Sequence, residues 1–175
     1  MTESFDLASP THFTTGTVGE PGQRVFFVQA TEAGVTVTLK VEKTQVAALA
    51  QYMAELLADL PPVPDDEVPF DLELVEPAIA EWVVGTIGVA FDETRDRMVV
   101  TFQEIQVVEE TEEPLLEADD GGGALATFVV TRPQALGFVR RAAELVSSGR
   151  PPCPLCGRPL DPQGHVCIKT NGHLH

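Results

Sequence analysis

The same order of sequence patterns occurs twice in the chain, and this repeat constrains the fold more than any other feature. Residues 13–19 read Phe-Thr-Thr-Gly-Thr-Val-Gly, and residues 82–88 read Trp-Val-Val-Gly-Thr-Ile-Gly. Each begins a strand pattern, and each is followed by a turn signal, two further strand patterns and a helical pattern. We therefore predict an internal duplication, with halves at residues 10–60 and 78–148.

The two helical patterns correspond position by position. Apolar residues recur at i, i+3, i+4 and i+7, which predicts one buried face per helix. The second set follows the first at an offset of 89 residues. The sets are Val46, Leu49, Ala50, Met53, Leu56 and Leu57, and Ala135, Phe138, Val139, Ala142, Leu145 and Val146. Capping boxes predict the helix starts, at Thr131 with Gln134 and, more weakly, at Glu42 with Gln45.

Three strands are expected in each half, at residues 12–18, 25–30 and 35–41, and at residues 79–91, 98–108 and 125–130. Short turns between successive strands predict an α+β fold, with an antiparallel sheet and both helices on one face. A proline-rich acidic linker, residues 61–77, separates the halves, and an acidic, then glycine-rich loop occupies residues 109–123. We assign residues 1–150 to this domain and residues 151–175 to a separate tail.

All three cysteines lie in the tail, at a spacing typical of a zinc knuckle. In Cys-x-x-Cys-Gly the turn lets both thiolates face one ion, and a histidine and cysteine two residues apart supply a second pair. We predict one zinc ion bound by Cys153, Cys156, His165 and Cys167. Four ligands favour a closed structural site over a catalytic one with an open position. His173 and His175 are alternatives to His165.

The net charge of −16 is unevenly distributed, because residues 151–175 are near +1 and the first 150 residues carry about −17. A body of this charge repels nucleic acid phosphates and anionic membranes, and it favours solubility or basic partners. If the acidic loop, residues 109–120, does more than stay solvated, we expect it to meet a basic protein surface.

Cysteine usage and the absence of targeting patterns predict the compartment. Three cysteines at metal-ligand spacing indicate zinc in a reducing environment rather than a disulfide framework. The first residues are acidic without an apolar run, and the longest apolar run, residues 82–91, is too short to span a bilayer. We expect a cytoplasmic protein.

Other motifs favour structural roles. Gly16 and Gly85 lie inside strand patterns, which indicates a bulge or close packing rather than a phosphate cradle. His12 is typical of an ordinary strand histidine, and the acids at 65–67 and 109–113 lack calcium-loop spacing. The main basic concentration is Arg132, Arg140 and Arg141, near Arg150 and Arg158. It is either a set of exposed helix charges or a dock for a phosphate or for an acidic segment of the same protein.

Two stretches together resemble a known family. They are Phe-Thr-Thr-Gly-Thr-Val-Gly-Glu-Pro-Gly-Gln-Arg at 13–24 and Cys-Pro-Leu-Cys-Gly-Arg-Pro-Leu-Asp-Pro-Gln-Gly-His-Val-Cys at 153–167, followed by Lys169 and Asn171-Gly172. This combination is similar to the actinobacterial DUF3090 family, across nearly the whole chain. The family is uncharacterised. The resemblance implies a pathway shared with a phosphatidylinositol-kinase-like protein and a phosphoglycerate-mutase-like phosphatase, and no particular activity.

The patterns favour a non-catalytic function, as a zinc-binding protein-interaction or accessory module with protein partners. The alternative is a metal-dependent or small-molecule enzyme with a site between the two halves. A second alternative is nucleic-acid binding through the knuckle, which the acidic body opposes. The oligomeric state is left open.

Overall fold

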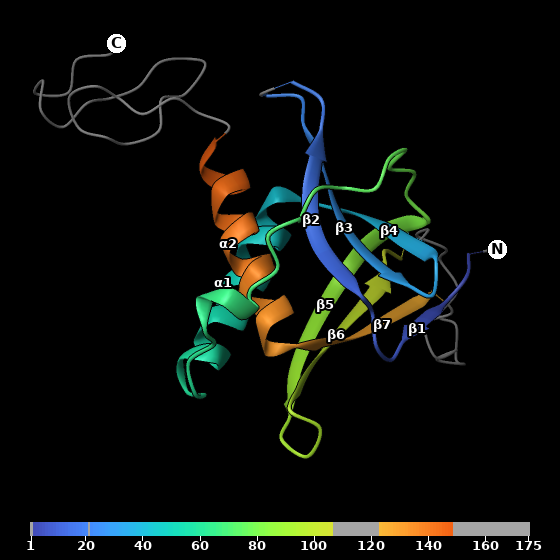
Figure 1. Cartoon of the computed structure of the whole chain (residues 1–175). Coiled ribbons are helices and arrows are strands. Elements are labelled where there is room, and N and C mark those ends of the chain that lie inside the picture. The colour runs from blue at the N-terminus through green and yellow to red at the C-terminus, as the bar shows by residue number, and fades with distance from the viewer. Residues whose placement is uncertain (1, 21, 107–122, 149–175) are drawn as a thin grey trace, which may run out of the picture.

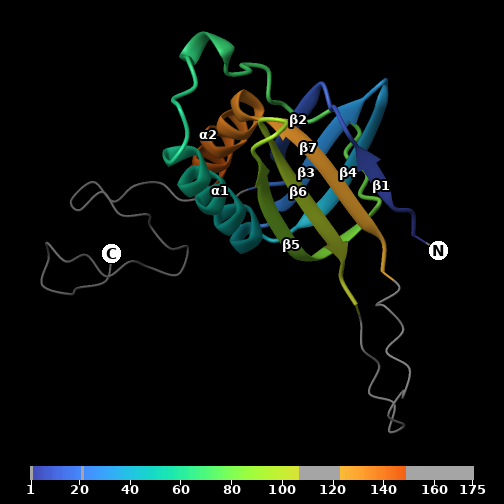
Figure 2. The same cartoon turned by 90° about the horizontal axis from the view of Figure 1, so that it is seen from below.

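A curled sheet of seven strands carries two helices that lie side by side on one of its faces (Figures 1 and 2). The computed structural model describes residues 2–20, 22–106 and 123–148. β1 (Phe5–Leu7) precedes the first half, which consists of β2 (His12–Val18), β3 (Val25–Glu32), β4 (Val35–Val41) and α1 (Lys43–Ala58). A short 3₁₀ helix, η1 (Asp65–Glu67), follows. The second half consists of β5 (Trp82–Asp92), β6 (Arg97–Glu104), β7 (Leu125–Thr131) and α2 (Arg132–Ser148).

The fold class is α+β as predicted, but the sheet is mixed and the prediction of an antiparallel sheet was wrong. The strand order is β1-β7-β6-β5-β4-β3-β2. Strands within each half pair antiparallel, whereas β4 pairs parallel with β5, through Leu39 with Trp82 and Lys40 with Val83. The reason is the connection: α1 and the segment after it carry the chain back across the sheet, and a crossover of this length sets the next strand parallel.

The second parallel pair involves β1, a strand that the sequence patterns did not predict. Phe5 to Leu7 pair with residues 126–128 of β7 at the sheet edge. Side-chain contacts hold this segment: the indole N–H of Trp82 donates to the Glu3 carbonyl and the Leu125 N–H donates to Ser4 Oγ, both at 2.9 Å, and Thr2 Oγ1 donates to Glu104 Oε2 at 2.6 Å. The beginning of the chain therefore closes the edge formed by the second half.

Both helices begin where their capping boxes predict. The Thr131 N–H donates to Gln134 Oε1 at 2.9 Å, and the Gln134 N–H donates back to Thr131 Oγ1 at 3.2 Å. At the first helix the Glu42 N–H donates to Gln45 Oε1 at 2.8 Å. The predicted apolar stripes face the core; the fully buried members are Val46, Leu49, Ala50, Met53, Ala135, Phe138, Ala142 and Leu145.

The core lies between the helices and the curled sheet. Phe13 of β2 stacks on Phe138 of α2 with ring centroids 4.7 Å apart. Phe13 also meets Phe128 of β7 edge-on at 6.1 Å, although β2 and β7 lie near opposite ends of the strand order. The sheet must therefore curl strongly, and α2 fills the space between its ends.

The two repeated glycines have the structural roles that the sequence indicates. A Cβ on Gly16 would lie 2.7 Å from Leu74 Cδ1, so this glycine makes room for a side chain from the segment between the halves. Gly85 lies where the β5–β6 register shifts between Val84 and Thr86, and its Cβ would lie 2.8 Å from Ile105 Cα. Gly16 thus permits close packing, and Gly85 marks a bulge.

Some predicted features differ at their ends or lie outside the described residues; the strand expected at residues 98–108, for example, ends at Glu104. The strand expected from residue 79 begins at Trp82, because residues 79–81 add only the bond from the Glu81 N–H to the Thr38 carbonyl, at 2.8 Å. Most of the predicted loop at 109–123 and all of the tail at 151–175 fall outside the described residues.

Candidate functional site

The predicted zinc ligands are not among the described residues. Cys153, Cys156, His165 and Cys167 all lie beyond residue 148, as do His173 and His175. Within residues 2–20, 22–106 and 123–148, no three His, Cys, Asp or Glu side chains are grouped so as to hold a metal ion. The zinc site stays a prediction, and the site described below is a different one.

The segment between the halves, residues 61–81, packs along β2 and β3 at one end. The side-chain amide of the fully buried Gln29 donates to the Val75 carbonyl at 2.9 Å and accepts the Val75 N–H at 2.8 Å. Thr14 Oγ1 donates to the Leu72 carbonyl, and His12 Nε2 lies 3.2 Å from the Asp71 carbonyl. We call residues 71–75 the strand end of the segment; the buried Gln29 and Thr14 and the half-buried His12 hold its backbone groups.

At its other end, which we call the helix end, the segment is held by arginines of α2. Arg140 Nη2 lies 2.8 Å from Asp65 Oδ1, and Arg132 Nη1 donates to the Pro61 carbonyl at 2.7 Å. Arg140 is therefore an exposed helix charge that also pairs with an acid of the same protein. The pair is exposed, with 51% of the Arg140 and 87% of the Asp65 side chain accessible, so it contributes little stability.

Arg132 also pairs with the turn between β5 and β6. Its Nε and Nη2 donate to the two carboxylate oxygens of Asp96, at 2.8 and 3.2 Å. This hydrogen bonding holds the pKa of the Asp96 carboxyl below its ordinary value, and it raises the pKa of the Arg132 guanidinium. Arg132 therefore links the start of α2 to a turn and to the segment, which orients the helix end.

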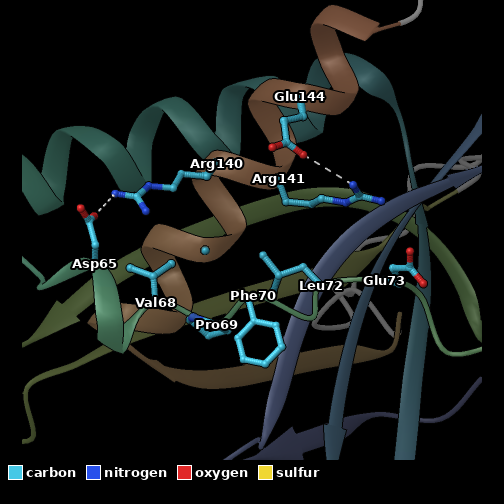
Figure 3. Close-up of a pocket in the computed structure, with 10 residues that line it drawn as sticks. Asp65, Val68, Pro69, Phe70, Leu72, Glu73, Arg140, Arg141 and Glu144 are labelled. Atoms are coloured by element: carbon cyan, nitrogen blue, oxygen red, sulfur yellow. Dashed lines mark hydrogen bonds and ion pairs between the residues drawn. The ribbon is translucent and has the colours of Figure 1, made fainter.

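A cavity of about 420 Å³ opens between α2 and the segment, lined mostly by the helix end and also by Leu72 and Glu73 (Figure 3). The segment supplies four apolar side chains and two acids, and α2 supplies a glycine and three charged side chains. The residues that line it from the segment are Asp65, Val68, Pro69, Phe70, Leu72 and Glu73; those from α2 are Gly137, Arg140, Arg141 and Glu144. Gly137 lies close to the segment, since a Cβ there would be in van der Waals contact with Leu72 Cδ1 and Pro69 Cδ, at 3.4 Å from each.

Arg141 is the least satisfied polar side chain of this cavity. Arg140 and Arg141 extend from α2 in opposite directions, Arg140 toward Asp65 and Arg141 toward Leu72 and Glu73 (Figure 3). The Arg141 side chain is 30% exposed, and its contact with Glu144 is long, at 3.6 Å. Its Nε is buried and has no hydrogen-bond partner among the described residues. A buried guanidinium N–H without a partner favours the binding of a ligand that supplies a hydrogen-bond acceptor.

Phe70 is the most exposed large apolar side chain that the structure describes, at 99%. It lies at the rim of the cavity between Pro69 and Leu72 (Figure 3). An exposed phenylalanine ring lacks most of the favourable transfer free energy that it would gain on burial. We call the cavity together with Phe70 the Phe70 groove; its surface suits a chain segment with an apolar side chain and charged neighbours.

A comparison with protein families gives a match that covers most of residues 1–150 and most of the tail, residues 151–175. The DUF3090 family model, described as "Protein of unknown function", matches residues 5–167. The chain belongs to the DUF3090 family. The match includes both walls of the Phe70 groove and reaches the last of the four predicted zinc ligands, Cys167.

No curated protein matches the DUF3090 chain. None of its described helices is long and apolar enough to cross a membrane.

Pattern reasoning on this DUF3090 chain missed the groove, although two of its residues carried a signal. Gly137 interrupts the middle of a helix, where glycine is unfavourable by about 1 kcal/mol relative to alanine, so it indicates a close approach. Phe70 is an aromatic residue in a stretch of prolines and acids that fits no strand or helix period. Neither signal says what packs against it, and the cavity emerges only from the path of residues 61–81.

Proposed function

We propose that this protein is a zinc-binding, non-catalytic protein-interaction module of the cytoplasm, and that the Phe70 groove is its docking surface. The observation that carries the proposal is Phe70 itself, 99% exposed beside a cavity. Aromatic side chains of this kind are the residues on which protein interfaces depend most, because their burial excludes water over a large area.

Charge around the groove supports a basic partner. Residues 61–81 contain seven Asp or Glu and neither Lys nor Arg. All seven of these acids are exposed. Such a surface speeds the association of a basic protein and opposes phosphate-bearing ligands, which favours a protein partner over nucleic acid.

The zinc site is the second part of the proposal. We propose that Cys153, Cys156, His165 and Cys167 bind one structural zinc ion, and that the metal supplies the folding energy of a segment too short to form a core. Elemental analysis of untagged protein should find about one zinc per chain. Less than about half an equivalent after gentle purification would count against the site.

We also propose that the two halves arose by an internal duplication. The order of three strands and a helix occurs twice, with α1 after β4 and α2 after β7. Superposition of the halves should align Gly16 with Gly85 and Leu49 with Phe138. Halves that superpose only with a different alignment would contradict a common origin.

Affinity purification from the native host, with matched baits, tests the interaction proposal. The baits are the wild type, Phe70→Ala and Ile79→Ala. Ile79 is 71% exposed in the same segment and does not line the groove, so it is the matched control. A partner that wild type and Ile79→Ala retain, and that Phe70→Ala loses, is expected. Partners retained equally by all three baits would refute the groove as the docking surface.

A further inference from the structure

We infer that the chain's own C-terminal segment, residues 149–175, occupies the Phe70 groove and regulates access to it. The inference rests on the proposed function, since it takes the groove as the docking surface and names a competitor for the partner. Three features of the chain point to this occupant: where the segment starts, its charge, and its apolar content.

The segment starts beside the groove. It follows directly on α2, which ends at Ser148, and Glu144 of the same helix lines the cavity. Four residues of helix correspond to about 6 Å along the axis. A chain of 27 residues beyond that point extends to tens of ångströms, so reach does not limit docking.

The segment also has the complementary charge. It holds three of the chain's eleven Lys and Arg but only one of its 27 Asp and Glu. The three cations are Arg150, Arg158 and Lys169. The stretch that lines the groove, residues 61–81, contains seven acids and no Lys or Arg. Attraction between such segments is strong at low ionic strength and is screened as salt rises.

Side chains of the segment match both walls of the groove. Its apolar residues, Leu155, Leu160, Val166, Ile168 and Leu174, suit the apolar wall around Phe70. Its single acid, Asp161, follows Leu160 directly and offers the acceptor that the buried Nε of Arg141 does not have among the described residues. Burying Phe70 and pairing Arg141 would satisfy the two features that the groove leaves open.

Because the segment is covalently attached, it competes with any partner for the groove. A tethered segment acts at an effective concentration of the order of millimolar, so a modest intrinsic affinity is sufficient for occupancy. A partner protein must then displace the segment. Zinc binding by Cys153, Cys156, His165 and Cys167 would shape the segment and so set how well it competes.

An indole placed at the groove tests the inference in the full-length, zinc-loaded protein. The chain has one tryptophan, Trp82, which is 5% exposed and provides a shielded background. We expect the indole of Phe70→Trp to emit at shorter wavelength than free tryptophan and to resist acrylamide quenching. Adding Arg158→Glu and Lys169→Glu, or raising NaCl to about 0.5 M, should increase its quenching about threefold or more, since both changes weaken charge attraction.

The matched control is Ile79→Trp, whose indole lies on the same segment outside the groove and should be quenched equally with either tail. An indole at position 70 that is as open as free tryptophan, with or without the tail substitutions, would overturn the inference. Shielding that grows with protein concentration would also overturn it, because the occupant would then be a second copy.

Zinc content, measured on the same samples, separates the two proposals. Full zinc with an open indole refutes tail docking and leaves the zinc-binding module standing. Absent zinc with a shielded indole refutes the zinc site and supports the docking.

Discussion

The two ends of one segment, residues 61–81, differ in almost every physical respect. At the strand end, the fully buried Gln29 satisfies both backbone groups of Val75, and Leu74 fits into the space above Gly16. At the helix end, the exposed pair Arg140–Asp65 holds the chain beside an open cavity, and Phe70 stands in water. The same stretch of chain is therefore anchored at one end and available at the other.

This difference separates residues that hold the fold from residues that are free to bind. Breaking a buried hydrogen bond costs free energy because no water replaces the lost partner, whereas an exposed ion pair contributes little to the free energy of unfolding. Substitutions at the strand end should therefore lower the free energy of unfolding markedly, and substitutions at the helix end should affect binding with little change in stability.

The largest effect is expected for Gln29→Leu. The substitution preserves volume but leaves the N–H and carbonyl of Val75 and the hydroxyl of Thr38 without their partner. We expect a loss of about 3 kcal/mol in the free energy of unfolding, measured by urea denaturation. Gln51→Leu, on the exposed face of α1, is the control and should change stability by less than about 0.5 kcal/mol. Equal losses in the two variants would mean that the strand end is not anchored through Gln29.

A smaller loss is expected for Gly16→Ala. The new methyl would overlap Leu74 and displace it from its site, which should lower the free energy of unfolding by about 1–2 kcal/mol. Gly88→Ala is the matched control in β5, because a Cβ there has nothing within 4 Å, and it should be neutral or slightly stabilising. A neutral Gly16→Ala would show that Leu74 does not depend on that glycine.

Local patterns predicted the elements well, for reasons that these residues make clear. The stripes from Val46 to Leu57 and from Ala135 to Val146 report burial directly, and the Thr131–Gln134 box marks a helix start with side chains only three residues apart. The pairing of the strands, by contrast, depends on residues that are distant in sequence. The parallel β4–β5 pairing follows from a crossover, and the three-residue strand β1 exists because β7 offers it an edge.

The groove was unpredictable for a related reason. Residues 61–81 have no strand or helix period, so no pattern indicates which surface they cover. Their path depends on Gln29, which reads in sequence as an ordinary polar residue of a strand and in the fold is the partner of Val75, 46 residues away. The sequence left the role of Arg140 open between an exposed helix charge and a dock for a phosphate or an acidic segment, and the exposed pair with Asp65 fits the first as well as the last.

The smallest effect on stability is expected at the helix end, for Arg140→Gln. Loss of the exposed pair with Asp65 should lower the free energy of unfolding by about 0.5 kcal/mol or less, and about 0.5 M NaCl should abolish even this difference. Lys43→Gln, on α1, is a control for the loss of one positive charge. A loss near that of Gln29→Leu would mean that both ends are anchored alike and would remove the distinction between them.

Hydrogen exchange along residues 61–81 tests the central claim most directly, because it compares the two ends within one molecule. The Val75 N–H, bonded to the buried Gln29, should exchange only through global or large-scale unfolding. The Phe70 N–H at the helix end should exchange through local opening and be at least about 100-fold less protected. That gradient is the result we predict. Equal protection at Val75 and Phe70 would contradict a segment that is anchored at one end and open at the other.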